Sequence, residues 1–321
     1  MTEDAEQRSA RLAALPFQPA APVGGRLTGF IAATRDVLRN RELLDLLVRR
    51  ELKARYKDSS LGLLWSFLRP LTMLLIYFVA IGQFLGAARS IPDFGIFVFT
   101  GLTLWGLYNE VITGGTQSIL GNAGLIKKVY LPREIFPLAA TGSALFNFLI
   151  QFVVLVAATA VFGQFPWSWN LLYVPAGIAI ALVYGVALAL LLSAWNVYLR
   201  DIQYLVEVAL MIFFWASPIV YSWSFVEQAA ERSEIPWLTD VYLLNPMSTA
   251  ILAFQKGLWK AGSESRVMGT DASGAEIVVG PQPWPADLDL RIVIMLLIGL
   301  VLLWVFQRVF ARLQGNFAQE I

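Results

Sequence analysis

Six apolar stretches of this chain are each long enough to cross a lipid bilayer as a helix. About 20 helical residues span the roughly 30 Å of hydrocarbon in a bilayer. The stretches lie at residues 63–86, 95–117, 137–162, 171–194, 204–222 and 291–310. Only 15% of the 321 residues are charged, against about 25% in soluble domains, so the chain lacks the polar surface of a soluble globule. The pattern predicts an all-α integral membrane protein with six transmembrane helices.

Lys and Arg residues gather in the connections on one side of these stretches. Eleven of them precede the first stretch, and others follow the second, fourth and sixth stretches. On the other side, the connection between the first and second stretches holds only Arg89, and GQFPWSWN, after the third, holds none. Because positively charged connections stay on the cytoplasmic side, we expect both termini in the cytoplasm.

The absence of certain residue types limits the chemistry of the chain. There is no Cys and no His, which excludes disulfides, Cys nucleophiles, Ser-His-Asp triads and thiolate or imidazole metal sites. No Gly-rich loop ends in Gly-Lys-Ser/Thr, the motif that binds nucleotide phosphates. Glu110 and Glu207 lie inside apolar stretches and are candidate functional acids. We favour the alternative that each is hydrogen-bonded or faces water near a helix end.

The segment before the first span has three predicted parts. Residues 1–34, rich in Ala and Pro, are expected to form a disordered cytoplasmic tail, without the basic and apolar regions of a secretory signal. Residues 35–58 are expected to form an amphipathic helix at the cytoplasmic interface, with apolar side chains on one arc and basic ones on the other. The six-span domain then covers residues 59–315, and residues 316–321 form a cytoplasmic tail.

Two cytoplasmic connections are too apolar to be free, solvated loops. The first, NAGLIKKVYLPREIFP at residues 122–137, is interrupted by Pro132, so we expect a short helix and then a turn into the third span. The second, WNVYLRDIQ at residues 195–203, places Arg200 and Asp201 at a turn. A chain with few buried ionisable groups needs an outside energy source, so these connections are predicted to dock a partner protein.

Residues 222–290 are expected to lie outside the cell and to contain re-entrant elements. LLNPMSTAILAFQKGLW, at residues 243–259, is apolar enough for a half-helix but too short to cross the membrane. Backbone that enters and leaves by one side is tolerated only where protein buries it or a cavity solvates it. The following residues, 261–289, are polar and contain scattered Gly and Pro, which is typical of an exposed loop.

Four sequence patterns together resemble the membrane subunit of ABC-2 exporters, in the branch that exports lipid-linked polysaccharides such as O-antigen, capsule and teichoic acid. The patterns are RRELKARYKDSSLGLLWSFLRP, LIKKVYLPREIFP, NVYLRDI and LLNPMSTAILAFQKGLW. The resemblance covers about residues 35–315, without the tail and the 261–289 loop. It implies the type V exporter fold, with an interface helix, six spans and short re-entrant helices before the last span.

The resemblance also implies partners and a location. We expect a homodimer in the bacterial inner membrane, two ATP-binding subunits on its cytoplasmic side and a pore between the two membrane subunits. The substrate would be a glycan on a polyprenyl-diphosphate carrier. No cofactor is expected on this chain, because ATP and Mg²⁺ would be bound by the partner subunit, and no nucleic acid is expected.

Two sets of candidate site residues follow from these expectations. The predicted ATPase-coupling residues are Arg49, Arg50, Lys53, Tyr56, Lys127, Lys128, Tyr130, Leu131, Pro132, Arg133, Glu134, Arg200 and Asp201. The candidates for the substrate channel are the aromatic residues Trp65, Trp105, Tyr108, Trp195, Trp215 and Tyr221, because sugar faces stack on aromatic rings, together with Arg69 and Asn109. Membrane-interface belts also use Trp and Tyr, so each aromatic residue has a packing alternative. Arg69 either contacts the lipid diphosphate or extends its charge to the interface.

Three alternative functions remain open from the sequence. The first keeps the fold and changes the cargo to a drug, haem or small lipid. The second is a membrane-embedded enzyme that acts on lipid-linked sugars, for which Asp287, Asp289 and Glu276 are the candidate acids. The third, a receptor or scaffold, is disfavoured because no stretch is suited to a folded soluble domain.

Overall fold

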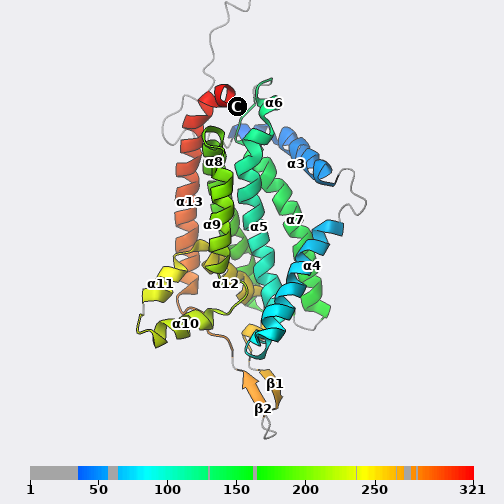
Figure 1. The fold of residues 1–321 in the computed structure, drawn as a ribbon, viewed down its shortest axis with the longest axis vertical. Helices are drawn as coiled ribbons and strands as arrows, with labels where there is room; N and C mark the ends of the chain where they lie inside the picture. Colours follow the sequence, from blue (N-terminus) through cyan, green and yellow to red (C-terminus); the bar gives the residue numbers. More distant parts are fainter. Residues whose placement is uncertain are drawn as a thin grey trace, which may run out of the picture.

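In the part of the chain that the structure describes, four long helices form the frame of the protein (Figure 1). The computed structural model describes residues 35–56, 64–128, 131–161, 165–235, 237–264, 266–270, 276–279 and 281–321. In this part of the chain, the helices long and apolar enough to cross a membrane are α5 (Phe94–Gly121), α7 (Ile135–Val161), α8 (Tyr173–Tyr198) and α13 (Leu288–Leu313). They confirm the second, third, fourth and sixth predicted spans and the all-α membrane fold.

Two shorter apolar helices occupy the positions of the first and fifth predicted spans. Helix α4 (Trp65–Tyr77) continues into a π-helix, η2 (Phe78–Phe84), and α9 covers Ile202–Trp215. The 14 residues of α9 rise about 21 Å, less than the roughly 30 Å of the hydrocarbon layer. Pro218 follows closely and disfavours helix in the residue before it. That α4 and α9 cross the membrane stays a prediction.

Helix α5 lies at the centre of the bundle and packs most extensively against α8 and α7 (Figure 1). Small residues permit this close approach. A Cβ added to Gly115 of α5 would lie 2.4 Å from the Cβ of Ala189 on α8. The same two helices meet again where Gly185 faces Val111, with a corresponding distance of 3.0 Å. Most of the apolar side chains of α5 are therefore buried, although its composition suits a lipid-facing span.

The connection between α9 and α13 folds into short elements. They are α10 (Trp223–Arg232), α11 (Trp237–Leu243), α12 (Pro246–Leu258), η5 (Lys260–Gly262), β1 (Arg266–Thr270) and β2 (Glu276–Val279). Helix α12 begins where the Asn245 side chain accepts a bond from the backbone N–H of Met247 at 3.0 Å, with Pro246 in the first turn. It is almost wholly buried, and its assignment as a re-entrant element stays a prediction. The predicted loop at 261–289 contains an antiparallel hairpin in which Val267 pairs with Val278.

The two ends of the bundle differ in composition. At one end lie α3 (Arg41–Tyr56), α6 (Ala123–Ile126) and α14 (Phe317–Glu320), and we call it the basic end (Figure 1). At the other end lie β1 and β2, and we call it the hairpin end. The remaining short helical turns are η3 (Ala87–Arg89), η4 (Trp169–Leu172) and η6 (Gln314–Asn316). Residues 1–34, for which a disordered tail was predicted, lie outside the described residues.

Candidate functional site

The apolar arc of α3 packs on the bundle, as its sequence predicts. Leu47 is buried in the core of the basic end. Val48 meets α7 so closely that a Cβ added to Gly142 would lie 2.7 Å from its methyl group. On the opposite arc, Lys53 is exposed, and the Arg49 Nε donates to Asp45 at 2.8 Å. The helix is thus fixed to protein on one face and presents basic side chains on the other.

Arg50 ties α3 to the connection between α5 and α7. Its guanidinium Nη2 donates to the Oδ1 of Asn122, and the Asn122 Nδ2 donates to the Ser118 carbonyl at 2.8 Å. Asn122 lies between α5 and α6, so its side chain fixes the point at which the connection begins. Asn122 is not among the residues predicted for coupling. The sequence gives one indication of its role: it is an Asn at the end of a long apolar helix, and Asn is common at helix ends.

A cavity of about 330 Å³ surrounds this bond between α3, α5 and α7. Its lining residues are Arg50, Glu51, Ala54, Glu110, Gly114, Gln117, Ser118, Gly121, Asn122 and Ala140. Glu110 accepts a hydrogen bond from the Asn147 Nδ2 at 2.7 Å, as expected, but it lies in the middle of α5 and not near a helix end. Glu207, the other acid inside an apolar stretch, is exposed on α9.

The connection between α5 and α7 packs on the bundle, as its apolar composition predicts. Ile126 and Phe136 are buried, whereas Lys127 and Lys128 are exposed. Pro132 lies between α6 and α7, where it separates the two helices. Among the predicted coupling residues, Leu131 is half-buried, Tyr130 lies outside the described residues, and the same is true of the side chain of Tyr56.

Arg133 and Glu134 both contact the C-terminal segment. The Arg133 guanidinium carbon lies 5.7 Å from the centroid of the Phe317 ring. The Glu134 side chain is buried and accepts a bond from the Gln314 Nε2 at 3.4 Å. Burial raises the pKa of the Glu134 carboxyl, and the hydrogen bond from Gln314 opposes that rise. This part of the predicted coupling connection therefore rests on the C-terminal residues.

The C-terminal segment is the main feature of the basic end that sequence reasoning missed. Phe317 is fully buried, with its ring centroid 5.5 Å from that of Phe310 and 6.2 Å from that of Tyr198. The Tyr198 hydroxyl also donates to the Leu313 carbonyl at 2.8 Å. We name the buried cluster here the basic-end core. Its residues are Leu47, Ile119, Ile126, Ile135, Phe136, Ala139, Leu190, Ala194, Val197, Phe310 and Phe317.

The basic-end core joins α3, the end of α5, the α5–α7 connection, the start of α7, the end of α8, the end of α13 and the C-terminal segment. A force applied to the exposed side of α3 or of the connection would therefore act on the ends of several long helices together, because packed interiors transmit strain. Arg200 and Asp201 lie at the turn between α8 and α9, where both are exposed. Their coupling role stays a prediction.

The channel candidates fall into buried and exposed groups. Trp105 and Tyr108 are buried on α5, and Trp105 packs edge-on against Phe214 with centroids 5.7 Å apart. Their burial within one chain favours a packing role over contact with a substrate. Trp65 and Trp195 are about half exposed, at 53% and 44%. These two aromatic rings remain available for a ligand, a lipid or a second chain.

The remaining channel candidates lie on α5, near α9 and on α4. Asn109 is half-buried, and Trp215, at the end of α9, is exposed. The Tyr221 hydroxyl donates to the Trp215 carbonyl at 2.7 Å and lies 3.1 Å from the hydroxyl of Tyr242, so it holds the chain that leaves α9. The side chain of Arg69 lies outside the described residues, and its two alternative roles stay predictions.

The acids considered for an enzyme hold structural positions. Asp287 forms a 2.7 Å ion pair with Arg291, whose guanidinium holds the pKa of that carboxyl below its usual value. Asp289 accepts a hydrogen bond from the Tyr173 hydroxyl at 2.6 Å. The Lys256 Nζ in turn donates to that hydroxyl at 2.9 Å. The two bonds of the Tyr173 hydroxyl link the start of α13 to the start of α8 and to α12.

The fold and the site define a polytopic α-helical membrane protein whose basic end presents one continuous packed surface. Residues 42–259 match the ABC-2 type transporter family, and the chain belongs to this family. It is 32% identical to the O-antigen export system permease protein RfbA of Myxococcus xanthus, over 70% of this chain and 83% of the relative. It is 28% identical to a protein of the same name from Klebsiella pneumoniae, over 67% of this chain and 79% of that relative. The family is one of transporter membrane subunits rather than of enzymes.

Proposed function

We propose that this chain is the membrane subunit of an ATP-driven exporter that moves a polysaccharide out of a bacterial cell. The observation that carries the proposal is its similarity to two O-antigen export permeases over two thirds or more of the chain. The proposed cargo is a glycan linked to a polyprenyl diphosphate, of the O-antigen, teichoic acid or cell-wall galactan type. The proposed location is the inner membrane.

The distribution of charge supports an orientation with the basic end in the cytoplasm. Lys127, Lys128 and Arg200 are exposed there, and positive connections stay on the cytoplasmic side. A separate ATP-binding subunit would dock at this end, on the exposed arc of α3 and the α5–α7 connection. The basic-end core would then carry its closure into α7, α8 and α13.

A homodimer is supported by one exposed charge. Glu207 is exposed on α9 among exposed apolar side chains that include Val208 and Met211. A carboxylate that faced lipid would be costly, so an intramembrane acid usually faces protein or a water-filled path. A second copy of the chain, with the pore between the two copies, would provide that environment.

Depletion of the chain in its own cell tests the function. We expect loss of the surface polysaccharide and accumulation of the undelivered glycan inside the cell, both reversed by the wild-type chain. If the surface polysaccharide is unchanged while the efflux of a drug or small lipid is lost, the cargo assignment is wrong. Glycan turnover by the purified chain without an ATPase would instead favour an enzyme.

A charge reversal tests the docking surface. Arg200→Glu should lower export severalfold while ATP hydrolysis continues, because an exposed residue at the α8–α9 turn can lose a docking contact without a loss of folding. Insertion and thermal stability should match those of the wild type, since exposed substitutions usually change stability by less than about 0.5 kcal/mol. Arg232→Glu, on exposed α10 near the hairpin end, is the matched control. Unchanged export in the Arg200 variant contradicts the assignment.

A further inference from the structure

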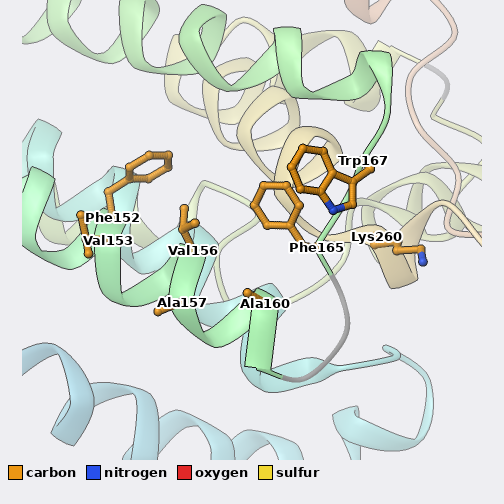
Figure 2. A pocket seen from close by; sticks show the side chains of 8 residues that line it. All are labelled: Phe152, Val153, Val156, Ala157, Ala160, Phe165, Trp167 and Lys260. Atoms are coloured by element: carbon orange, nitrogen blue, oxygen red, sulfur yellow. The ribbon is translucent and has the colours of Figure 1, made fainter.

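An apolar groove of about 720 Å³ lies along the last turns of α7 (Figure 2), in the half of the helix nearer the hairpin end (Figure 1). One wall is formed by α7, from Phe152 to Ala160, a rise of about 12 Å. Ala157 and Ala160 keep this wall low, because their side chains are single methyl groups. The other wall is formed by the rings of Phe165 and Trp167, with centroids 4.7 Å apart.

The groove has a charged outer end. Lys260 of η5 lines it beyond Trp167, at the opposite end from Phe152 (Figure 2). The Lys260 Nζ lies 3.8 Å from the nearer oxygen of Glu264, and both side chains are substantially exposed. Such a long, exposed ion pair contributes little to stability. The Lys260 ammonium can therefore bind another anion.

The position of the groove places that charged end near the membrane surface. Trp167 and Trp169 lie between α7 and α8 in the sequence, and each residue is 87% exposed. Trp residues of this kind concentrate at membrane–water interfaces. With these Trp residues at the membrane–water interface, Phe152 would lie in the hydrocarbon layer and Lys260 at the headgroup level.

We propose that this groove is a binding site for one anionic phospholipid of the leaflet at the hairpin end. One acyl chain lies along Val153, Val156 and Ala157, and the phosphate binds the Lys260 ammonium. An apolar channel with a cation at its outer end matches the polarity of such a lipid along its length. A zwitterionic lipid carries its own cation beside the phosphate and gains less from Lys260. The proposal does not depend on the identity of the transported substrate.

Native mass spectrometry of the full chain, purified in mild detergent, tests the proposal with phosphatidylglycerol and phosphatidylcholine of identical acyl chains. We expect one phosphatidylglycerol to be retained per chain in preference to phosphatidylcholine. Lys260→Gln should lower phosphatidylglycerol occupancy about fivefold, as expected for the loss of one Lys beside an anionic headgroup. Glu264→Gln should raise it, because a competing carboxylate is removed.

Filling the groove provides a second, independent variant. Ala157 is exposed, so Ala157→Trp should fold normally and prevent the acyl chain from entering, with loss of the retained lipid. Leu297→Trp, on the exposed face of α13, and Arg232→Gln, on α10, are the matched controls and should retain it. Equal retention of the two lipids, or retention unchanged by Ala157→Trp, overturns the proposal. Displacement of phosphatidylglycerol by equimolar polyprenyl phosphate also overturns it and assigns the groove to the carrier lipid.

Discussion

Asn122 illustrates how one polar side chain can fix the geometry of a predicted coupling connection. It accepts from Arg50 and donates to Ser118, so its loss leaves a guanidinium without this partner. Asn122→Ala should lower the free energy of unfolding by about 1.5–3 kcal/mol, the range for a hydrogen bond to a charged group. Thermal denaturation in detergent measures this.

The matched control is Asp45→Ala, which breaks the exposed ion pair between Asp45 and Arg49 on the same helix. Exposed pairs contribute about 0–1 kcal/mol, so this variant should unfold close to the wild-type temperature. Equal shifts for the two variants would show that the Arg50–Asn122 bond has no special role in holding α3.

Glu134 should make the stability of the basic end depend on pH. Burial raises the pKa of its carboxyl above the unfolded value, so the protonated form is favoured in the folded protein. The contribution of Glu134 to the free energy of unfolding is fully present below the pKa of the unfolded state. It is lost as the pH rises through the pKa of the folded state. Glu134→Gln, which is neutral at every pH, should abolish this component.

Thermal unfolding of the wild type and of Glu134→Gln across mildly acidic to neutral pH checks the sign. The wild-type melting temperature should fall relative to that of the variant as the pH rises. The opposite slope would mean that the hydrogen bond from Gln314 outweighs the cost of burial.

The role of helix α14 was the hardest to predict from the sequence. Residues 316–321 were predicted only as a cytoplasmic tail, yet Phe317 fills the basic-end core beside Phe310 and Tyr198. Phe317→Ala should cost about 3–5 kcal/mol, as for other buried Phe truncations. The substitution should also release the C-terminus from Arg133 and Glu134. Faster hydrogen exchange of the C-terminal amides would show this release.

The control for this variant is Phe317→Leu, which keeps most of the apolar volume and loses the ring. It should retain protection of the C-terminal amides with a smaller loss of stability, typically less than about 1.5 kcal/mol for such volume-conserving exchanges. If the C-terminal amides exchange at the wild-type rate in Phe317→Ala, α14 is not held by its aromatic contact.

Sequence patterns predicted the long helices because apolar length is a local property. The amphipathic arc of α3 was equally visible, and the structure confirms that Leu47 faces inward and Lys53 outward. The contacts between elements were not predictable in this way. Phe317 is one aromatic residue in a short polar segment, and Asn122 is one amide in a connection, so neither produces a periodic signal. Their roles depend on which distant helices the fold brings beside them.

The spans themselves show a second limit of sequence reasoning. Trp105 and Tyr108 were selected as channel candidates because aromatic residues in a span suit a glycan path, but α5 is central and both are buried. An apolar stretch does not reveal which of its faces meets lipid and which meets protein. The pairing of β1 with β2 was also not predicted, because a polar segment with Gly resembles a loop.

For the whole molecule, the position of Glu207 determines which face a second copy should cover. Exposed apolar side chains cover both α9 and α13. On α9 the exposed residues also include the acid Glu207. On α13 the exposed residues from Val293 to Val301 are all apolar. A face with only apolar side chains is satisfied by lipid. The face with a carboxylate requires protein or water, so the proposed dimer should form through α9.

The chain contains no Cys, so single introduced thiols can test this arrangement directly. Val208→Cys on α9 and Val301→Cys on α13 are matched, because both replace a Val that is more than half exposed, at 54% and 60%. In membranes under mild oxidation, Val208→Cys should give a disulfide-linked dimer and Val301→Cys should stay monomeric, since a disulfide requires Cα atoms within about 7 Å. Two thiols near the dimer axis lie within that limit. If only Val301→Cys gives a dimer, the interface is formed by α13. Glu207 would then face a water-filled path.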